Sequence, residues 1–130
     1  MKNNVLKMFK YLYYLSLIAL LFLYLFPGSL IGFFLYGDLG KQPNLVSNPI
    51  GTSINHLIFF FYLSILGFIN NINNYKFIYS FPFLLTVSIF FELAHLFIPN
   101  RAFENNDLLA NSMGVVFAFL ISKLIKKFKN

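Results

Sequence analysis

The segment that decides the fold reads ELAHLFIPNRAFENNDLLANSMG and covers residues 92–114. It contains three of the chain's four carboxylates, its only arginine and one of its two histidines. Long apolar runs flank the segment on both sides, and ionisable groups beside such runs are costly to bury in lipid. The segment therefore predicts two membrane-embedded helices that are joined by a short polar loop, with charged groups gathered at one end.

The composition of the whole chain agrees with an integral membrane protein. Of its 130 residues, 58% are hydrophobic and only 11% are charged, whereas a soluble domain of this length would carry more charge. We therefore expect a single transmembrane domain, residues 1–130. The absence of cysteine excludes disulfides and thiolate chemistry. The net charge of +6 comes mainly from lysines beside apolar runs, which indicates contact with lipid headgroups and not with nucleic acid.

Outward from this segment, the apolar runs predict an all-α bundle of four transmembrane helices. Each run approaches the roughly 20 residues that a bilayer core requires. We interpret the first run as a helix and not as a signal peptide, because it is long and no small-residue cleavage site follows it. Pro99 is expected to end the third helix. The predicted spans are residues 7–26, 54–69, 78–97 and 107–125.

A long outer loop, residues 29–52, is expected between the first two spans. Its first part, residues 30–36, is apolar, so we expect it to lie in the membrane interface or to re-enter the membrane. The remainder is rich in glycine and proline and is expected to be irregular. Apart from a leading span, the first fifty residues suggest no functional feature.

The distribution of lysine predicts the orientation of the bundle. Four spans place both termini on one side, and the basic residues expected there are Lys2, Lys7, Lys10, Lys76, Lys123, Lys126, Lys127 and Lys129. Only Lys41 and Arg101 remain on the opposite side. Because cytoplasmic segments carry the excess of lysine and arginine, we expect both termini in the cytoplasm and the polar segment at the outer face.

Three of the predicted helices direct polar groups inward at a similar depth. On each helix the polar residues share a face by the i, i+3, i+4 rule. Structural pairing and function are both open explanations, because buried ionisable groups need partners in either case. The expected polar cluster, to which the loop contributes its arginine, comprises His56, Glu92, His95, Arg101, Asp107 and Asn111.

Small residues on the same faces predict close helix packing. In lipid, helices associate through tight van der Waals contact, and small side chains allow their backbones to approach. On the fourth predicted span such residues recur every four positions. The expected packing positions are Gly67, Ala110, Gly114 and Ala118.

Sequence motifs give little support for a metal or a cofactor. Glu92 and His95 have the i, i+3 spacing of di-iron bundles, but the second such motif that those sites need is missing. His56, Glu92, His95 and Asp107 could form a mixed site for one divalent ion, although spacing alone is weak support. We find no glycine-rich phosphate loop and no nucleophile motif. We therefore expect neither a metal nor a cofactor.

The polar residues do resemble one family. The spacing Arg-x5-Asp-x3-Asn-x2-Gly, with a glutamate upstream and a histidine near the start of an earlier span, is similar to that of the VanZ-like membrane proteins. The residues that carry this resemblance are His56, Glu92, Arg101, Asp107, Asn111 and Gly114. The chain departs from the family pattern in two respects. Thr52 and Ser53 stand where the family often has Asp-Lys, and His95 stands where it usually has Gln.

The resemblance implies a small multi-span protein of the bacterial cytoplasmic membrane with a role in the cell envelope. The family takes its name from a protein linked to glycopeptide (teicoplanin) resistance. For this chain we expect binding or modulation of a lipid-linked or headgroup ligand, with membrane lipids or an envelope precursor as partners. An enzyme acting on such a lipid, with Glu92 or His95 as general base, and a proton-coupled carrier are the alternatives. The oligomeric state is left open.

Overall fold

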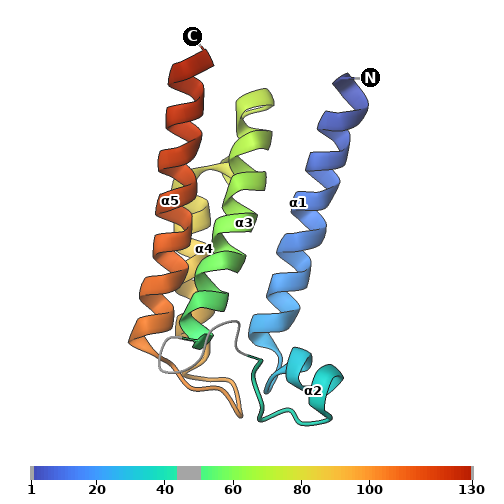
Figure 1. The fold of residues 1–130 in the computed structure, drawn as a ribbon, viewed down its shortest axis with the longest axis vertical. Coiled ribbons are helices and arrows are strands. Elements are labelled where there is room, and N and C mark those ends of the chain that lie inside the picture. Colours follow the sequence, from blue (N-terminus) through green and yellow to red (C-terminus); the bar gives the residue numbers. More distant parts are fainter. Residues whose placement is uncertain (1, 44–50, 130) are drawn as a thin grey trace.

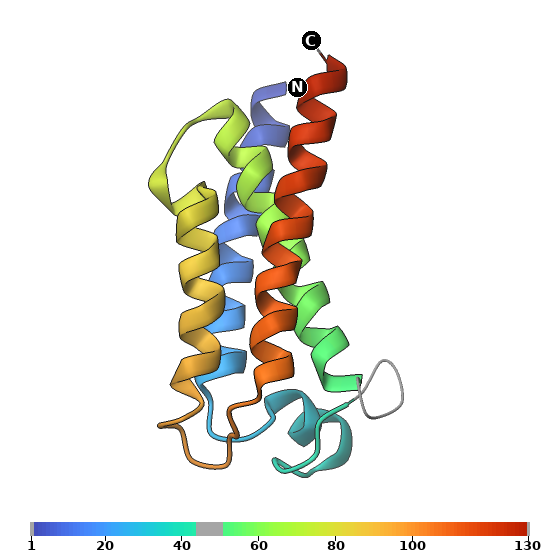
Figure 2. The ribbon, with the colours of Figure 1, turned by 90° about the vertical axis from the view of Figure 1, so that its left-hand side faces the viewer.

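The computed structural model describes residues 2–43 and 51–129, and the described chain is helical without any strand. The helices α1, α3, α4 and α5 run along one long axis, and the first and last described residues lie at the same end (Figures 1 and 2). Three helices, α1, α3 and α5, are long and apolar enough to cross a membrane, and α4 is a shorter apolar helix. The elements are α1 (Lys2–Leu25), α2 (Leu30–Tyr36), α3 (Gly51–Asn73), η1 (Phe77–Tyr79), α4 (Phe81–Ala94) and α5 (Asn105–Lys129).

The third predicted span, residues 78–97, differs most from the observed helices. It consists of the 3₁₀ turn η1 and the 14-residue helix α4. Ser80 separates them because its backbone is extended, and its hydroxyl caps α4 by accepting from the amide of Phe83. At the other end, the amides of His95, Leu96 and Phe97 bond three residues back, so the last turn tightens. The α-helix therefore ends before Pro99 can terminate it.

Residues 30–36, which were expected to lie in the membrane interface or to re-enter the membrane, form the short helix α2. The Ser29 hydroxyl accepts from the amide of Gly32 at 2.9 Å, and Gly37 ends the helix in the left-handed conformation at φ 70°. A Cβ on Gly32 would lie only 1.6 Å from the carbonyl oxygen of Lys41, so the following loop folds tightly against α2. Residues 37–43 contain no regular element. The rest of the expected irregular stretch, 44–50, lies outside the described residues.

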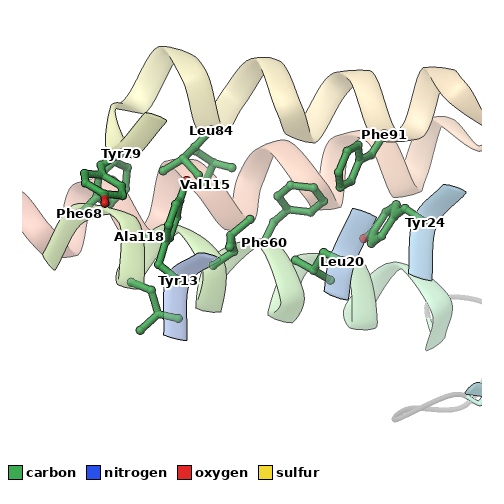
Figure 3. Packing of buried hydrophobic residues seen from close by; sticks show 12 residues of the cluster. Tyr13, Leu20, Tyr24, Phe60, Phe68, Tyr79, Leu84, Phe91, Val115 and Ala118 are labelled. Atoms are coloured by element: carbon green, nitrogen blue, oxygen red, sulfur yellow. The ribbon is translucent and has the colours of Figure 1, made fainter. Parts of the chain in front are cut away.

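Aromatic and aliphatic side chains fill the space between the helices. Figure 3 shows this core along the bundle axis, with Tyr13 and Leu20 from α1, Phe60 from α3, Leu84 from α4 and Val115 from α5. Many other large apolar side chains point outward and are exposed. An exposed apolar surface of this extent is expected where helices face lipid and not water.

Of the expected packing positions, Gly114 lies at a close approach of two helix backbones. A Cβ on Gly114 would lie 2.5 Å from the carbonyl oxygen of Leu57, so the backbones of α3 and α5 are in direct contact there. Ala110 and Ala118 are buried on the same helix. Gly67 instead faces side chains of α1 and α4. The contact between α3 and α5 places the start of α3 beside the first turns of α5, where the polar residues lie.

Candidate functional site: a buried polar cluster

The polar residues predicted from the sequence gather at the end of the bundle that carries α2, away from the chain termini (Figure 1). Three helices contribute to them: α3, the C-terminal part of α4 with its cap, and the first two turns of α5. Five of the six predicted residues are buried, with at most 8% exposure, namely His56, Glu92, His95, Asp107 and Asn111. We call these five residues the polar cluster.

Glu92 is fully buried, and its two carboxylate oxygens have different surroundings. Oε1 accepts from the backbone amide of Glu104 at 3.1 Å and lies 3.3 Å from Nδ1 of His95. Oε2 has no hydrogen-bond partner among the described residues, and it lies 3.6 Å from Nδ1 of His56. One oxygen is therefore held in place, while the other faces the interior of the polar cluster.

The two carboxylate oxygens of Asp107 also contact different residues. Its Oδ1 accepts a hydrogen bond of 2.6 Å from the hydroxyl of Ser53, and its Oδ2 lies 3.5 Å from Nε2 of His56. Asp107 stands in the first turn of α5, where unpaired amides and the helix dipole favour a carboxylate. His56 thus lies between two carboxylates that come from different helices.

Asn111 joins α5 to three other helices through its side-chain amide. Its Oδ1 accepts from the hydroxyl of Tyr24 at 2.9 Å and lies 3.2 Å from Nδ1 of His56, while Nδ2 lies 3.4 Å from the carbonyl oxygen of Ser88. An amide oxygen only accepts, so His56 carries a proton on Nδ1 when it makes this bond. In neutral His56, the lone pair of Nε2 then faces Asp107.

His95 contacts α1 as well as Glu92. Its Nε2 lies 3.1 Å from the carbonyl oxygen of Tyr24, which only accepts, so this nitrogen carries a proton. Its Nδ1 lies 3.3 Å from Oε1 of Glu92, so His95 joins this buried carboxylate to the backbone of α1.

Arg101 does not join the polar cluster as an ion-pair partner. Among the described residues no carboxylate lies within ion-pair distance of its guanidinium. It donates instead to the backbone carbonyls of Leu23 and Phe26, at the end of α1, where carbonyls have no partner within the helix. Burial lowers the pKa of Arg101, while Tyr24 and Glu92 act in the opposite direction. We expected Arg101 to lie among the carboxylates, but it binds backbone carbonyls at the C-terminal end of α1.

A small cavity lies beside the polar cluster. Its volume is about 60 Å³, and its polar lining residues are Tyr24, Ser29, Gln42, Asn55, His56 and Arg101. Glu92, His95 and Asp107 do not line it. His56 therefore stands between the cavity and the buried carboxylates.

Sequence reasoning missed Tyr24, which brings α1 into the site through its hydroxyl and its carbonyl. It is one of eight tyrosines and lies in an aromatic-rich apolar run, so nothing in the sequence distinguished it as a site residue. The fold and the polar cluster define an all-helical protein with three helices able to cross a membrane and a buried ionisable site at one end. No protein-family model, curated protein or solved structure matches the chain.

Proposed function

We propose that the chain is a four-span, VanZ-like protein of the bacterial cytoplasmic membrane, with α4 as the fourth span. The proposal is supported by the position of α4, which lies alongside the three longer apolar helices (Figure 2). The lysine-rich first and last turns lie at one end, with Lys76 in the turn between α3 and α4. By the positive-inside rule this end is cytoplasmic, and the polar cluster lies near the outer leaflet.

In this arrangement the protein binds the anionic headgroup of a lipid or of a lipid-linked envelope precursor. The observation that carries the proposal is the shared position of Arg101 and His56 on one polar cavity. A guanidinium has five N–H donors, and only two of its nitrogens donate to the carbonyls of α1. The remaining donors are suited to a phosphate or carboxylate oxygen.

The size and surroundings of the cavity fit a headgroup better than a whole lipid. A volume of about 60 Å³ accommodates only a few polar atoms, so most of the ligand would stay at the membrane surface. The neighbouring helix α2 presents Phe33 and Phe34, which are 49% and 81% exposed. Exposed phenylalanines on an interfacial helix bury their rings at the boundary between headgroups and acyl chains.

The geometry gives less support to the alternative functions. Glu92 and His95, the expected general bases, do not line the cavity in which a substrate would bind. A proton carrier needs a polar path through the bundle, but Leu63, Leu84 and Val115 fill the core beyond the polar cluster. The position of the cavity therefore favours ligand binding over these two alternatives.

The test compares lipid binding by the full-length protein and three variants in nanodiscs. Arg101→Gln removes the charge and keeps an amide donor, Arg101→Lys keeps the charge, and Lys41→Gln removes another cation expected on the same side. We expect Arg101→Gln to lower the affinity for anionic lipid about tenfold, since a charge-assisted hydrogen bond contributes about 1.5–3 kcal/mol. Lys41→Gln should bind like the wild type. Equal binding by a folded Arg101→Gln protein would exclude the proposal.

A further inference from the structure

Three side chains of the polar cluster bring metal-ligand atoms together from three helices. One ring nitrogen of His56, one oxygen of Glu92 and one oxygen of Asp107 lie within 4.8 Å of one another. Ligand atoms around a tetrahedral ion, each about 2.1 Å from it, lie roughly 3.4 Å apart. The atoms that lie farthest apart would therefore have to approach by up to about 1.4 Å to reach the spacing that one small ion requires.

Each of the three ligands is also oriented by a partner on its other atom. The backbone amide of Glu104 and the imidazole of His95 hold Oε1 of Glu92, Ser53 holds Oδ1 of Asp107, and Asn111 holds Nδ1 of His56. Such outer hydrogen bonds fix the direction of metal ligands and set the tautomer of a ligating histidine. The other oxygens of both carboxylates face the imidazole of His56: Oε2 of Glu92 lies 3.6 Å from Nδ1, and Oδ2 of Asp107 lies 3.5 Å from Nε2.

The uncommitted oxygen of Glu92 is an independent indication that something is bound there. Glu92 is fully buried, and its Oε2 has no hydrogen-bond partner among the described residues. A buried carboxylate oxygen without a partner is costly, whereas a cation in front of it removes the cost. A divalent ion would also balance the two negative charges of Glu92 and Asp107.

We infer that His56, Glu92 and Asp107 form a binding site for one divalent metal ion of the first transition row, with Zn²⁺ and Mn²⁺ as the best-matched ions. One imidazole nitrogen with two carboxylate oxygens is a donor set that both ions accept. Three protein ligands leave a coordination position for a further group, and His56 lines the neighbouring cavity. This inference revises the expectation of no metal and does not depend on the proposed headgroup binding.

The experiment measures metal uptake by the full-length protein in detergent. The protein carries a purification tag without histidine, is stripped with a chelator, and is dialysed against Zn²⁺ or Mn²⁺ before elemental analysis. We expect about one bound ion per chain and a higher unfolding temperature with metal, since a ligand that binds only the folded state stabilises it. Bound Co²⁺ should show the visible absorption of a site with nitrogen and oxygen ligands.

Matched variants assign the bound ion to this site. Glu92→Gln and Asp107→Asn keep the shape of the ligands and should lower the affinity at least tenfold. Glu104→Gln changes an exposed carboxylate and leaves the backbone amide that bonds Glu92, so it should bind like the wild type. Folded wild-type protein that takes up no metal, or folded Glu92→Gln and Asp107→Asn proteins that bind as tightly as the wild type, would overturn the inference. If both variants misfold, the wild-type stoichiometry and Co²⁺ spectrum decide.

Discussion

Gly114→Ala tests the direct backbone contact between α3 and α5. An added Cβ would lie 2.5 Å from the carbonyl oxygen of Leu57 and 2.8 Å from the amide nitrogen of Phe61. Both atoms belong to the backbone of α3, so rotation of a side chain cannot relieve the overlap. To reach the 3.4 Å of ordinary contact, the carbonyl must move by about 0.9 Å. The substitution therefore pushes two packed helices apart.

The expected loss of stability follows from two opposing contributions. Replacing glycine by alanine inside a helix contributes about 1 kcal/mol in favour of folding, because the unfolded chain loses less freedom. Overpacking a well-filled interface costs about 1–3 kcal/mol, and the upper end applies where backbone must move. We therefore expect Gly114→Ala to lower the free energy of unfolding by about 2 kcal/mol.

Gly67→Ala is the matched control, because it has the same gain in helix propensity. Its added Cβ would lie 3.0 Å from Cδ1 of Leu84 and 3.2 Å from Cε2 of Tyr13, both side-chain atoms that can shift. We expect its stability to stay within about 1 kcal/mol of the wild type. Unfolding is measured by titrating SDS into mixed micelles and following far-UV circular dichroism, since the chain has no tryptophan. A Gly114→Ala protein as stable as the Gly67→Ala protein would refute the backbone contact.

Asn111→Ala leaves the hydroxyl of Tyr24 and the imidazole of His56 without their shared acceptor. We expect it to lower the free energy of unfolding by about 3 kcal/mol. The control Asn106→Ala, at an exposed position, should lower it by no more than about 0.5 kcal/mol. Ser53→Ala removes the hydroxyl that donates to Oδ1 of Asp107. We expect it to weaken the metal affinity measured by dialysis by about 10- to 100-fold, with little change in helicity. An unchanged affinity would contradict the orienting role of Ser53. Because the chain lacks cysteine, an impermeant maleimide should label Lys41→Cys in intact spheroplasts and Lys127→Cys only after lysis, and the reverse pattern would contradict cytoplasmic termini.

Apolar runs of about 20 residues strongly indicate transmembrane helices of matching length. Three of these runs correspond to α1, α3 and α5. The division of the third run was not predictable from hydropathy, because local hydrogen bonds at Ser80 and after Ala94 determine where α4 begins and ends. The short helix α2 has readable signals in Ser29 and Gly37, a helix cap and a left-handed terminator. From these signals a helix over residues 30–36 could have been predicted.

Helical spacing placed Glu92 beside His95, and Asp107 beside Asn111, because residues three or four apart share a face. Which faces meet depends on how the helices pack, and a single sequence does not contain this information. Arg101 shows the difficulty, since its donors are satisfied by the carbonyls of α1 and not by the expected carboxylates. The convergence of three ligand atoms likewise became visible only in three dimensions.

The shortness of α4 has a consequence for the surrounding bilayer. Its 14 residues rise about 21 Å, whereas the hydrocarbon layer is about 30 Å thick. If α4 faces acyl chains along its length, the membrane thins beside it or flanking side chains reach to the interface, whereas the 25 residues of α5 are long enough to span the layer. Such hydrophobic mismatch costs fractions of a kcal/mol for each ångström, so lipids with shorter tails should surround α4 preferentially.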